Sequence, residues 1–143
     1  MRTLVNIAAA AALVLVGSGC PLDPPERVER LGIIQVLPDF PADVGVPQTA
    51  AAGEPFVASV VTRGSGCLTA GSTRVRRGGM MADVRPYDLD LGERDCDTNV
   101  VFHQHVATLS FDQAGPATVR FIGIGYPGGE IVTVTRTVTI TSP

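Results

Sequence analysis

The chain has 143 residues, of which 45% are apolar, 5% aromatic and 17% charged. This length suits one globular domain and excludes an enzyme with separate cofactor and substrate domains. Eleven basic residues, all arginine, stand against fourteen acidic ones, and the net charge of -3 gives no sign of a nucleic-acid binder.

The first twenty residues have the pattern of an export signal. Met1 and Arg2 provide positive charge, a mostly apolar stretch interrupted by Asn6 covers residues 4–16, and small residues follow. The stretch is shorter than the roughly 20 apolar residues that a membrane-spanning helix needs. We therefore expect the protein to be exported without a spanning helix.

The sequence GSGC at residues 17–20 resembles the lipobox of bacterial lipoproteins, although Gly17 stands where that family prefers Leu. The resemblance implies that residues 1–19 are a signal peptide, that Cys20 carries the lipid, and that the chain is anchored in the bacterial cell envelope. Because no Asp follows Cys20, it also implies the outer membrane of a Gram-negative host. An ordinary secretory signal that ends near a cysteine is the alternative.

The segment after this cysteine is rich in proline and charge. Residues 21–30, PLDPPERVER, contain three prolines and few aliphatic side chains, which is typical of an extended and solvated tether. At about 3.1 Å per residue such a tether reaches roughly 30 Å. We expect residues 20–30 to connect the lipid to a domain that covers residues 31–143.

Short β-branched or alternating runs, separated by Gly, Pro and Asp, predict an all-β domain. In residues 130–141, EIVTVTRTVTIT, the apolar Val132, Val134, Val138 and Ile140 share one face against a row of Thr, so one face should pack and the other meet water. The expected strands cover residues 31–37, 44–46, 56–62, 73–77, 81–87, 100–111, 117–124 and 130–141.

Two stretches resemble bacterial immunoglobulin-like and fibronectin-III-like domains. They are PQTAAAGEPFVASVV at residues 47–61 and ATLSFDQAGPATVRF at residues 107–121. The resemblance implies an immunoglobulin-like, antiparallel sandwich of two sheets with about seven or eight strands. The chain has no Trp, and Cys96 precedes the long strand, so a disulfide here would tie a loop or an edge instead of crossing the core as in antibody domains.

Cysteine usage predicts one disulfide. With Cys20 carrying lipid, Cys67 and Cys96 form an even pair in an oxidising compartment. A bond between them would close a loop of about 30 residues. A reactive thiol or a metal thiolate is the alternative, but the neighbours that such a site needs, as in CxxC spacing, are absent.

His103 and His105 are one candidate metal site, because alternate residues of a strand point to the same face. They share the parity of Ala107 and Leu109, so a regular strand would turn both rings inward. We expect a bulge, or a position near a sheet end where the rings are hydrogen-bonded or partly wet. Structural histidines without a metal are the main expectation.

Residues 88–97 contain five carboxylates in ten positions, and such oxygen-rich loops suit calcium. The order of residues does not match an EF-hand. The expected structure is a solvated surface loop, partly neutralised by Arg94 and by Arg74, Arg76 and Arg77.

No catalytic motif is present, and we expect neither enzyme activity nor a cofactor. Residues 123–128 match GxGxxG, but Pro127 and the β-branched run that follows predict a hairpin instead of a phosphate-binding helix. The sequence leads us to expect an envelope lipoprotein whose domain is a binding or structural module, with the membrane and an envelope protein as partners. A metal-binding periplasmic protein that uses His103 and His105 or the acidic residues 88–97 is the alternative.

Overall fold

The computed structural model describes residues 26–92 and 96–143. These residues form strands and contain no helix, so the all-β prediction is confirmed. The strands are β1 (Val28–Leu31), β2 (Ile33–Gln35), β3 (Val44–Gly45), β4 (Thr49–Ala51), β5 (Phe56–Ser65), β6 (Leu68–Gly78), β7 (Met81–Asp90), β8 (Val100–Leu109), β9 (Gly115–Tyr126) and β10 (Ile131–Thr141).

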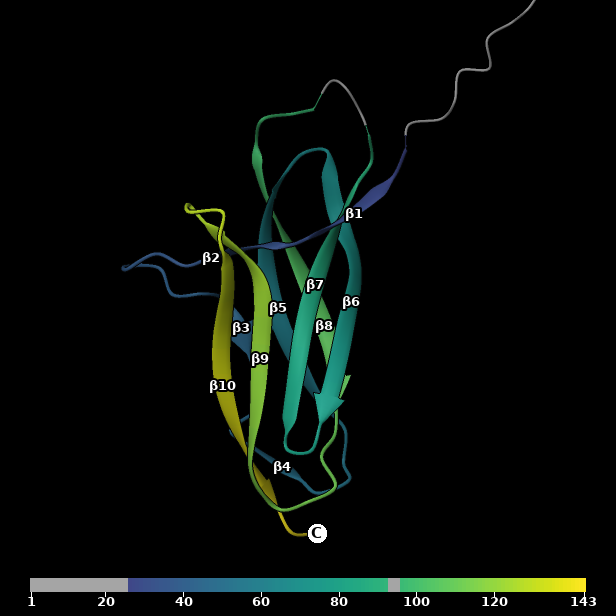
Figure 1. The fold of residues 1–143 in the computed structure, drawn as a ribbon, viewed down its shortest axis with the longest axis vertical. Helices are drawn as coiled ribbons and strands as arrows, with labels where there is room; N and C mark the ends of the chain where they lie inside the picture. The colour runs from purple at the N-terminus through teal and green to yellow at the C-terminus, as the bar shows by residue number, and fades with distance from the viewer. Residues whose placement is uncertain (1–25, 93–95) are drawn as a thin grey trace, which may run out of the picture.

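The strands lie in two layers that face each other (Figure 1). In one layer the hydrogen-bonded order is β6, β7, β9, β10 and β4, and in the other β5 lies between β3 and β8. Strand β2 joins the layers, because Ile33 pairs with Ile124 of β9 and with Arg63 of β5. The arrangement is compatible with a β-sandwich.

The pairing is mixed, so the prediction of an antiparallel sheet throughout is wrong. Strand β10 runs parallel to β4, and β9 runs parallel to both β2 and β7. The cause is the path of the chain: β8 follows β7 but pairs with β5 in the other layer, which leaves β7 and β9 as neighbours with the same direction. The described part of the chain has ten strands, more than the seven or eight expected.

The N-terminal strands enter between β7 and β9. These two strands pair only over residues 81–84 and 118–121, and beyond that point β1 pairs with β7 while β2 pairs with β9. The predicted strand 31–37 is thus replaced by two short strands that divide at Gly32, and β1 begins at Val28, inside the segment expected to be tether.

Gly32 closes this junction. Its N–H donates to the carbonyl of Pro86 at 2.9 Å, and its own carbonyl accepts from the N–H of Ile124 at 3.0 Å. A Cβ atom at this position would overlap Cγ2 of Thr62 and lie 3.2 Å from Oδ2 of Asp88. Only glycine lets the backbone pass this close to the interior.

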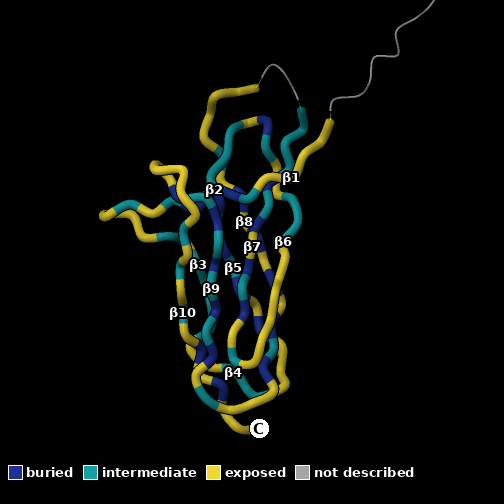
Figure 2. Tube along the Cα trace, in the orientation of Figure 1, coloured by how far each residue is buried: buried dark blue, intermediate teal, exposed yellow. Residues whose placement is uncertain are grey.

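Buried residues lie along the strands of both layers (Figure 2), and the core between the layers is made of aliphatic and aromatic side chains. Phe56 and Phe111 stack with ring centroids 6.0 Å apart. On β10, Val138 and Ile140 are buried while the alternating Thr side chains are exposed, as the sequence predicts. Residues 123–128 end β9 and turn into β10, so the expected hairpin is confirmed.

Candidate functional site

His103 and His105 point from β8 into the interior, where they meet Thr62 of β5 and Asp88 of β7. We call these four residues the polar cluster; each is at most 9% exposed. Nδ1 of His103 lies 2.9 Å and Nε2 of His105 lies 3.0 Å from Oδ1 of Asp88, and the hydroxyl of Thr62 donates to the same oxygen at 2.9 Å. The expected hydrogen bonding is confirmed. The register of β8 on β5 is unbroken and both rings are buried, so the expectation of a bulge or of a partly wet position is wrong.

The carboxylate of Asp88 is the common acceptor of the polar cluster. Burial by itself raises the pKa of Asp88, but hydrogen bonds from His105, Thr62 and His103 outweigh it and lower the pKa below the ordinary value. The carboxyl group is therefore ionised at neutral pH. Its second oxygen, Oδ2, is buried beside Gly32 and has no hydrogen-bond partner among the described residues.

The polar cluster holds its two rings on the carboxylate. Among residues 26–92 and 96–143, no group of three or more His, Cys, Asp or Glu side chains is arranged to hold a metal ion. An ionised carboxylate only accepts hydrogen bonds, so the ring nitrogen of each histidine that faces Asp88 donates its N–H to Oδ1. This geometry is that of a structural network which fixes three strands relative to one another.

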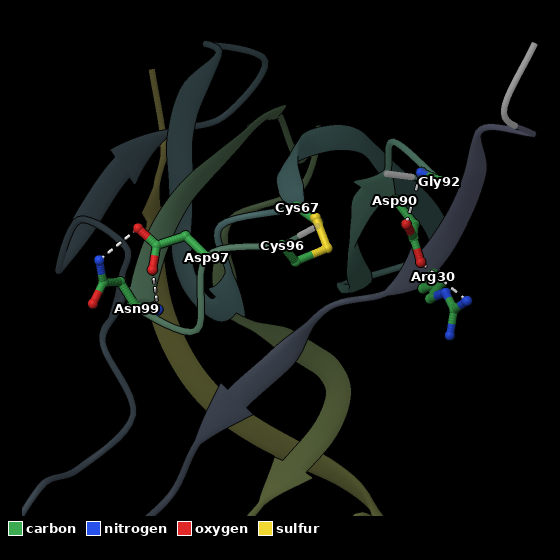
Figure 3. The surroundings of a disulfide bond; sticks show 7 residues. All are labelled: Arg30, Cys67, Asp90, Gly92, Cys96, Asp97 and Asn99. Carbon is green, nitrogen blue, oxygen red and sulfur yellow. Dashed lines mark hydrogen bonds and ion pairs between the residues drawn. A yellow bond between two sulfur atoms is a disulfide. The ribbon is translucent and has the colours of Figure 1, made fainter. Parts of the chain in front are cut away.

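The acidic stretch is divided among different surroundings, so the prediction of one solvated loop is wrong. Asp88 is buried, Asp90 lies in β7 and pairs with Arg30 at 3.0 Å, and Asp97 accepts hydrogen bonds from the backbone and side chain of Asn99. Residues 93–95, including Arg94, lie outside the described residues. Figure 3 shows Asp90 and Asp97 on opposite sides of the disulfide.

The arginines expected to neutralise this stretch have other contacts. Arg74 pairs with Glu29, and Arg77 donates to the backbone and hydroxyl of Ser110. Asp90 is paired instead with Arg30, which belongs to β1. Sequence spacing gave no signal for this pairing, because β1 reaches β7 only through the fold.

Cys67 and Cys96 form the predicted disulfide, with Cα atoms 5.1 Å apart (Figure 3). It ties the turn between β5 and β6 to the segment that precedes β8. Backbone hydrogen bonds from Gly66 to Asp97 and from Leu91 to Cys67 support the same junction. The bond therefore holds loops at one end of the domain, as expected, and does not cross the core. Cys20 lies outside the described residues.

A groove of about 600 Å³ lies on the outward side of β5 and β8, away from the core. Because alternate residues of β8 face opposite sides, the strand that buries His103 and His105 exposes Phe102 and Val106. We call this site the outer groove; its lining residues are Gln35, Phe40, Pro41, Asp43, Val61, Arg63, Phe102 and Gln104.

Large apolar side chains are gathered in and beside the outer groove. Phe40 is 63% and Phe102 60% exposed, and Val106, four residues further along the same face of β8, is 57% exposed. Phe40 is presented by a tight turn in which Leu37 and Phe40 exchange two backbone hydrogen bonds. Apolar exposure of this kind is uncommon on a soluble surface and marks interaction sites.

The outer groove also has charged and amide groups available to a ligand. The guanidinium of Arg63 stacks 3.9 Å above the ring centroid of Tyr126, which fixes its position. Neither Arg63 nor Asp43 makes a salt bridge with another described residue. The motifs of the sequence do not point to this site, although Phe102 and Val106 have the parity opposite to that of the buried Ala107 and Leu109.

Comparisons with known proteins give no relative for this chain. No protein-family model, no curated protein and no solved structure matches it. Across the part of the chain that the structure describes, no helix is long and apolar enough to cross a membrane.

Proposed function

We propose that this protein is an exported, lipid-anchored component of the bacterial envelope, and that its β domain binds a segment of a partner protein in the outer groove. The observation that carries the proposal is the pair of exposed phenylalanines, Phe40 and Phe102, which flank a hollow of about 600 Å³. Ligand sites of proteins have volumes of about 300 to 1,000 Å³ and combine apolar walls with a few polar groups.

A peptide segment fits the chemistry of the outer groove better than a purely apolar ligand does. Asp43 and Arg63 offer one negative and one positive charge without internal salt bridges, and Gln35 and Gln104 offer amides that pair with backbone N–H and C=O groups. The apolar surface of Phe102 would receive an aliphatic or aromatic side chain.

The anchor rests on the lipobox resemblance of residues 17–20. Acylation of Cys20 would place the domain at a membrane without a spanning helix. Mass spectrometry of the native protein tests this step: we expect an N-terminal Cys20 peptide that carries acyl chains and is lost in the Cys20→Ala variant. An intact signal peptide or an unmodified Cys20 would overturn it.

The likeness to bacterial immunoglobulin-like and fibronectin-III-like domains belongs to the same proposal. It is supported by the two facing layers and by the hairpin of β9 and β10, which falls in the predicted place. The parallel pairing of β7 and β9 separates this chain from a simple antiparallel version of that architecture.

Cross-linking in intact cells tests the outer groove. A photoreactive residue at Phe102 should capture one defined envelope protein, whereas the same residue at Thr135, exposed on β10 in the other layer, should not. Adding Arg63→Ala to the Phe102 probe should reduce the capture. Equal capture from both positions, or none from position 102, would contradict the proposal.

Metal binding through His103 and His105 is the second candidate function. His and Asp are ligand types that bind zinc, and the two rings lie with Asp88 in one buried cluster, but their atoms are joined there by hydrogen bonds and are not arranged around a metal. Elemental analysis of protein purified without chelator, with thermal unfolding in the presence and absence of EDTA, decides between metal and hydrogen-bonded cluster. Stoichiometric metal and an EDTA-sensitive melting temperature would support this candidate.

A further inference from the structure

Arginines are concentrated on the layer opposite the outer groove. Arg74 and Arg76 of β6 lie across from Arg85 and Asp83 of β7, and Arg120 of β9 lies beside Asp83. The alternate residues Ala82, Val84, Val119 and Phe121 are buried, so these side chains point outward from the layer nearer the viewer in Figure 1. With Arg77 at the edge, we call Arg74, Arg76, Arg77, Arg85 and Arg120 the arginine face.

The arginine face has the opposite charge to the chain as a whole. Five arginines against the two carboxylates of Glu29 and Asp83 leave a formal +3, whereas the whole chain carries -3. Arg74 is paired with Glu29, and Arg120 donates two hydrogen bonds to Asp83 at 2.7 and 3.0 Å. Arg76, Arg77 and Arg85 make no salt bridge with any described residue.

Protection of a sheet edge does not account for this arrangement. Charged side chains on an edge strand discourage pairing with another protein, and that explains arginines on β6. Arg85 and Arg120 belong to β7 and β9, which have hydrogen-bonded neighbours on both sides. Arg74 and Arg85 also lie directly opposite each other, a like-charge pair that destabilises a sheet.

The arginine face lies close to the point where the chain would leave the membrane. Glu29 in β1 pairs with Arg74 and accepts a hydrogen bond from the backbone N–H of Ser72. Glu29 lies nine positions after Cys20 in the sequence, and nine residue steps span at most about 32 Å. Arg76 is two positions further along the strand from Arg74, so it adds only about 7 Å.

We propose that the arginine face docks on the anionic lipid headgroups of the membrane that holds the protein, with phosphate groups pairing to Arg76, Arg77 and Arg85. The proposal rests on the lipid anchor of the proposed function. Guanidinium groups pair with phosphate in a forked geometry, and Arg76, Arg77 and Arg120 line a hollow of about 300 Å³ beside Met81. Docking this layer on the membrane leaves the outer groove, on the other layer, open to its partner.

Vesicle binding by the mature chain, residues 20–143 with Cys20→Ala, tests the proposal without any acyl chain. We expect binding to vesicles of equal parts phosphatidylglycerol and phosphatidylcholine, none to phosphatidylcholine alone, and loss of binding at about 0.5 M salt. Arg76→Gln with Arg85→Gln should weaken binding about 30-fold. The matched pair Arg63→Gln and Arg136→Gln, which removes the same charge elsewhere, should change it less than about 3-fold.

One further double variant and one other polyanion complete the test. Arg76→Lys with Arg85→Lys should keep most of the binding, because the charges remain, and unfolding curves should show that all variants fold. Equal binding to both vesicle types, or equal loss in the matched pair, would overturn the proposal. Binding of dextran sulfate without binding of anionic vesicles would replace the membrane with an anionic polysaccharide and also overturn it. None of these outcomes tests the lipid on Cys20 or the outer groove, for which separate experiments are given above.

Discussion

The two sides of β8 reverse the usual distribution of polarity in a half-buried strand. His103 and His105 face the interior, while Phe102 and Val106 face solvent with more than half of their surface exposed. On most such strands the apolar side chains would be the buried ones. The two sides differ in this way although they belong to one strand and share one backbone.

The difference lies in what the rest of the chain provides for each side. Inside, Asp88 and Thr62 meet the two rings with hydrogen bonds of 2.9 to 3.1 Å, so the buried polar groups are compensated within the domain. Outside, nothing in the described residues covers Phe102. We infer that the inward side serves stability and the outward side serves binding.

Removing the acceptor of the polar cluster should have the largest effect on stability. Asp88→Ala leaves two buried rings and a hydroxyl without their common partner, and we expect a loss of about 3 to 5 kcal/mol in unfolding free energy. Denaturant unfolding measures it, with Asp112→Ala on the exposed turn after β8 as the control. A loss below about 1 kcal/mol would mean that the inward side is not a stabilising network.

The disulfide, at the end of the domain, should contribute nearly as much to the unfolding free energy as Asp88 does. Replacing Cys67 and Cys96 by Ser opens a loop of 29 residues, and the chain-entropy estimate for such a loop is about 3 to 4 kcal/mol. We expect the loss in the double variant and in reduced native protein alike. If the variant and the oxidised native protein had the same unfolding free energy, the disulfide would have no stabilising role.

Acid should reduce the contribution of the polar cluster to the stability of the fold. The pKa of Asp88 is lowered in the folded protein, so its contribution to stability is complete above the unfolded value of about 3.9 and is lost as the pH falls from there through the folded pKa. Unfolding midpoints between about pH 2 and 7 measure this. Asp88→Asn should reduce the fall of the unfolding midpoint at acid pH, whereas Asp112→Asn should leave that fall unchanged. An unchanged fall in Asp88→Asn would show that Asp88 is not the group responsible.

A substitution on the outward side of β8 should impair binding and leave stability nearly unchanged. Phe102→Ser should change the unfolding free energy by no more than about 0.5 kcal/mol, because the ring is 60% exposed. The same substitution should abolish partner capture by a photoreactive residue at Phe40, which lies in the same outer groove. A large loss of stability with capture retained would show that the ring belongs to the core.

Local patterns in the sequence identified most strands but not their partners. The alternation of residues 130–141 predicts β10 and its buried face, and the inward parity of His103 and His105 is equally local. Asp88 meets these rings only because β7, in one layer, packs against β8 in the other. Gly32, near the N-terminal end of the domain, packs against the same cluster. Such long-range neighbours leave no periodic signal, so the predictions of one acidic surface loop and of antiparallel pairing throughout were wrong.

Footprinting of surface side chains in the native envelope tests the central claim most directly. Photochemical labelling would be compared between protein in its own membrane and purified protein, residue by residue. We predict strong protection of Phe40, Phe102 and Val106 in the envelope, with labelling of the buried Leu109 unchanged. Equal labelling of the outer groove in both samples would show that no partner occupies it.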